Sequence, residues 1–269
     1  MKYALVNGQP QEAFPGGKGL CRGCGGDVIA KCGTQRLHHW AHWGERECDS
    51  WWEPETEWHR AWKNHFPAGC QEVIQYDEKS GEKHIADIRT NHGLVIEFQH
   101  SHLKPEERAA RERFYGNMVW VVDGSRLKRD FSRFLKGKND LRQTNNQGYF
   151  LHSFPEECFS AMWLESSVPV IFDFRGVGEE EAADVWRDGL WCLLPERAVG
   201  SAVVVAMSRE QFVAVAPSRP QLLPYQEIMA GFTQRIREMR AADEARQMYQ
   251  RMGGMPGRIV PGRRRFSRF

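Results

Sequence analysis

The sequence predicts a mixed α/β fold of the α+β type, built from three consecutive regions and a final long helix. Three observations predict it. Residues 51–123 alternate between helical and strand-like patterns, residues 1–50 are rich in glycine, cysteine and histidine, and residues 146–222 carry further apolar runs of strand length. Hydrophobic residues make up 41% of the 269 residues and charged residues 27%, which is typical of a folded globular protein.

Changes in composition predict four regions along the chain. We place them at residues 1–50, 51–138, 139–222 and 223–269. A chain of 269 residues is long enough for one large domain or for two modest ones. The first two regions carry the candidate chemistry, whereas residues 139–222 carry no motif that indicates a reaction.

The second region has the most regular pattern. Proline is favoured in the first turn of a helix and stops a helix that has already formed, so Pro54 and Pro67 bracket the first helix. Runs of β-branched and aromatic residues between Gly and Asn turns predict strands. The expected elements are a helix over 54–66, strands over 72–76, 84–90 and 94–99, a helix over 104–116 and a strand over 118–124.

Shorter strand-like pieces lie on both sides of this region. "DVIAKCG" and "QRLHHWAH" lie within residues 27–42. Beyond residue 146 the runs "PVIFDF", "LWCLLP", "SAVVVAM" and "QFVAVA" predict the strands of a smaller α+β module. Residues 225–252 then predict a long, charge-rich helix, and residues 253–269 a basic, disordered tail.

The chain lacks the usual signals of secretion and membrane insertion. No apolar run approaches the roughly 18 residues of a membrane-spanning helix, and the N-terminus has no extended apolar core before a cleavage site. We therefore expect a cytoplasmic protein with no membrane partner. In that reducing compartment, clustered cysteines indicate metal binding more than disulfides.

The cysteines near the N-terminus predict a structural zinc site. Cys21 and Cys24 form a C-x-x-C motif followed by two glycines, the pattern of a zinc knuckle. The candidates for the two remaining ligands are His39, His42, Cys48 and, less readily, Cys32. Regular strand alternation would separate His39 from His42, which favours His42 with Cys48; the pair His39 and His42 stays as the alternative. We therefore predict that residues 1–50 form a small zinc ribbon around Zn²⁺.

Two acids stand inside otherwise apolar strands. Asp87 lies in "HIADIRT" and Glu97 in "LVIEFQ", and the "NHG" turn between them predicts an antiparallel hairpin that brings the two acids together. Alternation along the strand puts Gln99 on the same face as Glu97. Two carboxylates and an amide oxygen at one point predict a site for Mg²⁺ or Mn²⁺, which prefer oxygen ligands.

A charged stripe precedes this hairpin. Glu55, His59 and Lys63 are four residues apart, so in a helix they form a single face. An ordinary solvated face with ion pairs would have the same spacing. The strand acids that follow favour a functional interpretation.

Taken together, these motifs resemble the CoiA-like competence-protein nucleases of the PD-(D/E)xK superfamily. The resemblance covers about residues 1–136. The matching pieces are "CRGC", "HWAH" at 39–42, "ETEWHRAWK" at 55–63, "ADI", "IEFQHS" and "RERFYGNMVWVVDG". The resemblance implies a restriction-endonuclease-like core and metal-dependent hydrolysis of DNA phosphodiester bonds, in DNA uptake, recombination, a mobile element or defence.

The resemblance also implies roles for the site residues. Glu55 would complete the metal shell of Asp87 and Glu97, His59 would bind a ligand or phosphate, and Lys63 would supply positive charge. Gln99 stands where most of the superfamily has lysine, and an amide can orient water but carries no charge. The alternative hypothesis is therefore a catalytically inactive zinc-ribbon accessory protein that binds or processes DNA.

Charge is distributed unevenly along the chain. The formal net charge is only +2, but residues 124–138 and 257–269 are locally basic. This net charge does not by itself indicate a nucleic-acid ligand, and a basic tail can equally be a solubilising end. The resemblance implies DNA as the partner, single- or double-stranded, and residues 139–222 offer a surface for a protein partner.

Overall fold

The computed structural model describes residues 1–44, 48–78, 80–176 and 184–251, which form two β-sheets and seven α-helices. The N-terminal sheet is antiparallel, with strand order β2-β1-β3-β4-β5. Its strands are β1 (Tyr3–Val6), β2 (Gln9–Glu12), β3 (Lys18–Leu20), β4 (Asp27–Lys31) and β5 (His39–His42). The mixed α/β class is therefore confirmed.

The larger sheet has nine strands in the order β10-β11-β14-β13-β12-β9-β8-β7-β6. Its strands are β6 (Gln71–Tyr76), β7 (Lys83–Arg89), β8 (Val95–Gln99), β9 (Met118–Asp123), β10 (Arg142–Gln143), β11 (Tyr149–His152), β12 (Val170–Asp173), β13 (Leu190–Leu193) and β14 (Ala202–Met207). The central strands β8, β9 and β12 are parallel, and the outer pairs are antiparallel.

Helices cover both faces of this sheet. One core packs Trp58 and Trp62 of α1 (Glu57–Lys63) with residues of α6 (Arg209–Val215) and the start of α7 (Tyr225–Arg251). The opposite core packs Trp120 against side chains of α3 (Lys128–Gly137) and α4 (Ala161–Leu164). The remaining helices are α2 (Pro105–Tyr115) and α5 (Val185–Asp188).

The predicted order helix, three strands, helix, strand is observed as α1, β6, β7, β8, α2 and β9. α1 is shorter than predicted. It begins after Thr56, whose hydroxyl accepts the backbone N–H of His59, and it ends at Lys63. The helix begins after Thr56 and not near Pro54 because the Thr56 side chain accepts the free N–H of His59 in the first turn, which a proline side chain cannot do.

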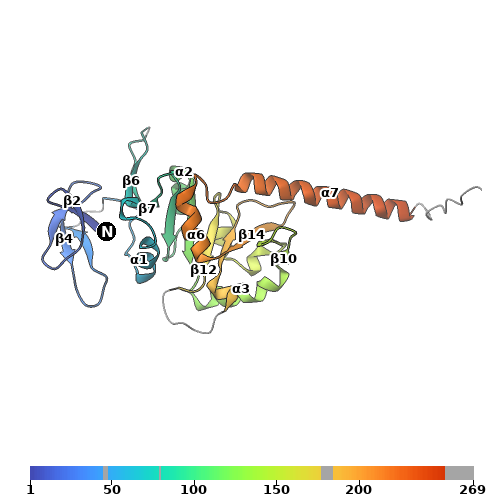
Figure 1. Ribbon diagram of the computed structural model, residues 1–269, viewed down its shortest axis with the longest axis horizontal. Coiled ribbons are helices and arrows are strands. Elements are labelled where there is room, and N and C mark those ends of the chain that lie inside the picture. Colours follow the sequence, from blue (N-terminus) through green and yellow to red (C-terminus); the bar gives the residue numbers. More distant parts are fainter. Residues whose placement is uncertain (45–47, 79, 177–183, 252–269) are drawn as a thin grey trace, which may run out of the picture.

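Strands from the third predicted region continue the same sheet. β12 pairs in parallel with β9, and β11, β13 and β14 extend the sheet beyond it (Figure 1). The sheet therefore crosses the predicted boundary at residue 138 without a break.

One predicted strand is wrong. Residues 211–216, "QFVAVA", lie mostly in α6. Ser208 and Gln211 form a reciprocal capping box that begins a helix, and Phe212 is buried on its inner face. The apolar run alone could not distinguish a short strand from a short buried helix.

α7 extends away from the body of the molecule (Figure 1). Met229 and Phe232 are its buried residues, and both lie in the first third of the helix. Among the described helices, α7 included, none combines the length and apolar character needed to cross a membrane. The predicted disordered tail, 253–269, lies outside the described residues.

Candidate metal centre and acid cavity

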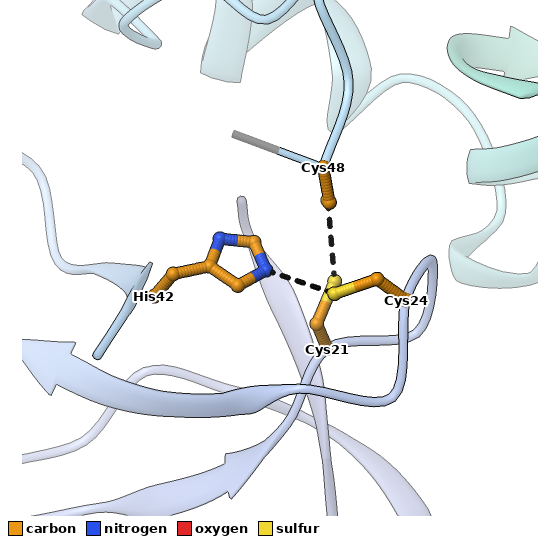
Figure 2. Close-up of side chains that lie close together, drawn as sticks. All are labelled: Cys21, Cys24, His42 and Cys48. Atoms are coloured by element: carbon orange, nitrogen blue, oxygen red, sulfur yellow. Dashed lines mark hydrogen bonds between the residues drawn. The ribbon is translucent and has the colours of Figure 1, made fainter. Parts of the chain in front are cut away.

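Four side chains near the N-terminus converge on one point (Figure 2). Their donor atoms lie within 4.8 Å of one another, and the four residues are Cys21, Cys24, His42 and Cys48. The sulfur atoms of Cys21 and Cys48 are 3.6 Å apart, and Cys24 Sγ is 3.3 Å from His42 Nε2. A tetrahedron with Zn–S bonds of about 2.3 Å has edges of about 3.8 Å, so the four donors are spaced for zinc.

Backbone amides turn toward two of these sulfurs. The N–H of Gly23 donates to Cys21 Sγ at 3.3 Å, and the N–H of Gly26 donates to Cys24 Sγ at 3.4 Å. Gly25 has a φ of +68°, which the tight turn requires and which glycine adopts without strain. These bonds stabilise charge on sulfur, as a zinc knuckle needs.

The donor chemistry also fits zinc. Burial and the neighbouring sulfurs of Cys21 and Cys24 raise the pKa of Cys48 to about 12. A bound cation reverses this effect because zinc ligates the thiolate form. The cluster could therefore hold a metal ion such as zinc, with three sulfurs and one imidazole.

The favoured ligand set is the one that the structure brings together. His39 is not in the cluster; its Nδ1 is 2.8 Å from the carbonyl oxygen of Leu37. Cys32 follows the end of β4 and is also outside it. Strand alternation between His39 and His42 was therefore a sound guide.

The second cluster lies where β7 and β8 separate. The regular ladder between these strands includes Ile88 opposite Ile96. One step further along, the Asp87 N–H donates to Glu97 Oε1 at 3.1 Å, and the Phe98 N–H donates to Asp87 Oδ2 at 3.0 Å. Each carboxylate thus replaces a backbone carbonyl of the ladder, and the two acids meet in the gap, as the hairpin predicted.

Lys63 brings a positive charge to these acids from α1. Its buried ammonium is 3.1 Å from Glu55, 3.1 Å from Glu72 and 3.4 Å from Asp87. Burial alone lowers the pKa of Lys63, but these carboxylates outweigh it and hold the pKa above its ordinary value. Lys63 is therefore the central cation of the cavity, and its predicted proximity to the acids is observed.

Glu72 is a member of this cluster that the sequence did not indicate. Its backbone has a φ of +50°, a left-handed conformation that costs a non-glycine residue energy. Its carboxylate accepts the N–H groups of Lys2 at 2.7 Å and Tyr3 at 3.0 Å, which ties β1 to the larger sheet. Burial opposes ionisation, but Lys63, the N-terminal ammonium and these N–H groups lower the pKa of Glu72 to about 2.

The negative charge of Glu97 is offset by neighbouring cations less fully than that of Glu72. Burial and the charge of Asp87 raise the pKa of Glu97 to about 8, while Arg111 opposes them from 3.5 Å. Arg111 also binds Glu107 four residues earlier on α2, so in the sequence it was indistinguishable from an ordinary surface ion pair.

Gln99 lies on the cavity side of β8, as alternation predicted. Its amide nitrogen donates to Glu53 Oε1 at 2.8 Å, and the hydroxyl of Ser101 donates to Glu53 Oε2 at 2.5 Å. Glu53 precedes the first helix in an irregular stretch, so no periodicity marked it as a site residue.

His59 and Glu55 hold structure as well as lining the cavity. His59 Nε2 contacts the carbonyl oxygen of Phe98, and its Nδ1 is 3.2 Å from Thr56 Oγ1, so both ring nitrogens have protein partners. Glu55 pairs with Arg60 and Lys63, which lower its pKa despite its burial. His59 thereby fixes α1 against β8, whereas Glu55 ties the segment that precedes α1 to the helix itself.

A buried carboxylate also anchors α1 from the other side. Asp173 is fully buried and accepts the indole N–H groups of Trp58 and Trp62, each at 2.9 Å. Arg209 of α6 pairs with the same carboxylate. The position of the helix that carries Lys63 therefore depends on residues far along the chain.

These side chains enclose a cavity of about 70 Å³, lined by Asp87, Glu97, Gln99 and Lys63 among others. It shares Met1, Trp52 and Glu55 with a larger cavity of about 830 Å³. The small cavity has room for an ion with a water molecule or two.

The acids do not all meet at one point. In the part of the chain that the structure describes, Glu55, Asp87 and Glu97 do not form a group of three donors within 4.8 Å of one another. Lys63 lies between Glu55 and Asp87. The shared magnesium or manganese site of these three residues thus stays a prediction.

A single segment joins the two clusters. Residues 48–56, the connecting segment, run from Cys48 to the cap of α1. Asp49 accepts the N–H of Ile85 at 2.7 Å and contacts His84 at 2.8 Å, which holds the segment against β7.

No protein-family model, curated protein or solved structure matches this chain.

Proposed function

We propose that the protein is a metal-dependent nuclease that hydrolyses DNA phosphodiester bonds, as its resemblance to the CoiA-like proteins implies. The observation that carries the proposal is the pairing of Asp87 and Glu97 across the open end of the β7–β8 hairpin. The order of elements around them supports it, since α1, three strands, α2 and the strand β9 follow one another as the sequence predicts, and β9 pairs in parallel with β8.

The chain's own residues would act in defined ways. Asp87 and Glu97 offer hard oxygen donors to Mg²⁺ or Mn²⁺ at the small cavity. A bound ion would lower the pKa of a water molecule and offset charge that develops on the phosphate. Gln99 would orient that water through its amide, and Lys63 would keep Glu55 and Glu72 ionised.

The donor set fits a divalent cation at Asp87 and Glu97, and Glu55 has a second feature that favours binding. Glu55 Oε1 is buried, and it lies 3.1 Å from Lys63 Nζ, with which it forms an ion pair. A small movement of Lys63 would free this oxygen for an ion. Glu55 as a third ligand is therefore part of the proposal.

Cleavage assays test the proposal directly. Plasmid and single-stranded DNA are incubated with Mg²⁺ or Mn²⁺ and with wild type, Asp87→Ala, Glu97→Ala or the control Glu78→Gln, whose side chain is exposed. We expect wild type and Glu78→Gln to cut, and the two alanine variants to lose more than about 100-fold in rate. Equal cleavage by all four proteins, or none by wild type, would refute the nuclease.

The second candidate is a catalytically inactive zinc-ribbon accessory protein that binds or processes DNA. The observation in its favour is that Lys63 and Arg111 already neutralise the acids, which leaves less need for a divalent ion. DNA binding by wild type in a gel-shift assay, without metal-dependent cutting, would favour it over the nuclease.

The biological setting follows from the same proposal. A nuclease of this type would serve DNA uptake or recombination, a mobile element or defence. A protein partner would bind through the strands and helices of residues 139–222, and we propose the cytoplasm as the compartment.

A further inference from the structure

The amide of Gln99 is held in one orientation by a closed ring of hydrogen bonds. Gln99 Nε2 lies 2.8 Å from Glu53 Oε1, 3.2 Å from the carbonyl oxygen of Ser101 and 3.3 Å from Ser101 Oγ. All three are acceptors toward the amide, because the hydroxyl hydrogen of Ser101 is donated to Glu53 Oε2.

The opposite orientation of the amide is excluded by the same contacts. A flipped Gln99 would place its oxygen 2.8 Å from a carboxylate oxygen and close to the carbonyl of Ser101. Neither contact would contain a hydrogen, and Gln99 is buried, so water could not relieve the repulsion. The nitrogen therefore faces Glu53.

This orientation decides which atom of Gln99 remains for the cavity. With the nitrogen engaged, the free atom is the amide oxygen, and Gln99 lines the same small cavity as Asp87 and Glu97. Position 99 then adds a third acceptor to two carboxylates. A lysine at position 99 would add a positively charged hydrogen-bond donor. The glutamine differs from it in charge and also in presenting an acceptor to the cavity.

We propose that Glu53 is a positioning residue, which fixes the amide of Gln99 so that its oxygen serves as the acceptor facing the reaction site. The proposal rests on the nuclease function and assigns a role within it to a residue that the sequence motifs omit. Glu53 acts through Gln99, and its side chain is 21% exposed, so it is accessible to substitution without a large cavity.

The first test reads the amide itself and needs no activity. In protein labelled with ¹⁵N-glutamine, we expect the side-chain NH₂ of Gln99, assigned by its loss in Gln99→Glu, to exchange slowly with solvent. In Glu53→Leu, which removes the acceptor, this protection should fall about tenfold or more, whereas in Glu78→Gln it should be unchanged. Unchanged protection in Glu53→Leu would overturn the proposal.

The second test reverses the pair. Gln99→Glu sets two carboxylates against each other and should lower kcat about 10- to 100-fold, as should Glu53→Gln alone. In the double variant E53Q/Q99E the amide at position 53 can donate to the carboxylate at 99, so we expect kcat to return to within about threefold of wild type. The KM for DNA should stay constant because neither change alters a group that holds DNA.

The outcomes separate this proposal from the nuclease itself. A double variant no more active than Gln99→Glu would overturn the positioning role while leaving the nuclease intact. If wild type cuts no DNA, the nuclease fails, and the exchange measurement alone decides whether Glu53 fixes the amide.

Discussion

The two polar clusters at either end of the connecting segment differ in what their buried polar side chains contact. In the cluster of Cys21, Cys24, His42 and Cys48 the donors contact one another. In the acid cavity the carboxylates contact cations that belong to the chain, Lys63 and Arg111.

This difference teaches which cluster depends on an added ion. Burial and the neighbouring sulfurs raise the pKa of the Cys48 thiol, so the N-terminal cluster needs a metal to hold Cys48 as a thiolate. The acid cavity already contains positive charge and can fold without a metal. An ion that enters it must then compete with Lys63.

The largest effect should come from removing a ligand of the first cluster. Binding of a structural zinc ion contributes on the order of 10 kcal/mol, so Cys48→Ala should lose zinc and unfold the N-terminal sheet. Elemental analysis should find one zinc per chain in wild type and none in the variant, and trypsin should cut the variant rapidly at lysines and arginines before residue 40.

Cys32→Ala is the matched control, since this cysteine belongs to the same N-terminal region but lies outside the cluster, after the end of β4. It should keep its zinc and its resistance to trypsin. Zinc-free wild type with an intact N-terminal sheet would remove the distinction between the two clusters.

Lys63→Met should make the stability of the acid cavity depend on an added cation, as we expect for the zinc cluster. Glu55, Glu72 and Asp87 would lose their shared cation, which should lower the free energy of unfolding by about 3–5 kcal/mol. Mg²⁺ in large excess should restore about 2 kcal/mol by taking the place of the ammonium. Urea unfolding followed by tryptophan fluorescence, with and without Mg²⁺, measures both effects.

The exposed Lys136 supplies the control, because Lys136→Met should change neither stability nor its response to Mg²⁺. If Mg²⁺ stabilised wild type as much as Lys63→Met, then Lys63 would not compete with the ion.

A smaller effect should come from Glu72→Gln, and it should depend on pH. The pKa of Glu72 is about 2 in the folded protein against an ordinary value of 4.5. Its contribution, about 3 kcal/mol, is therefore complete above the unfolded value and disappears as the pH falls toward the folded value. The stability difference between wild type and Glu72→Gln should be largest near about pH 7 and shrink by about pH 3. A constant difference would contradict the ion pair.

The smallest effect should be that of His39→Ala. His39 is outside the metal cluster and contacts only a backbone carbonyl among the bonds described above. Zinc content should be unchanged, and stability should change by less than about 1 kcal/mol. Loss of zinc would return His39 to the ligand set.

The sequence predicted most of the fold where local signals agreed with the tertiary structure. The hairpin of β7 and β8 followed from alternating residues around a turn at Gly93, whose φ is +85°. The prediction of a strand over residues 211–216 was wrong because an apolar run of that length fits either a strand or a buried helix. The pairing of β9 with β12 could not be predicted from the sequence, because it joins segments about fifty residues apart.

The candidate site was predictable only where residues stood in a motif. The cysteine pair with His42 and Cys48 could be proposed from spacing and alternation. Glu53 and Glu72 could not, because their partners come from other elements and only the folded chain brings them together. His59 stood in the motif, yet the structure bonds it to the backbone at Phe98.

The carboxylate of Asp173 links the first 138 residues to the rest of the chain. A fragment that ends at residue 138 would keep every side chain of the acid cavity, yet the indoles of Trp58 and Trp62 would have lost their common acceptor. It would also uncover one whole edge of β9, which invites aggregation. Residues 1–138, which carry both polar clusters, therefore cannot be separated from the part of the chain whose sequence says least about chemistry.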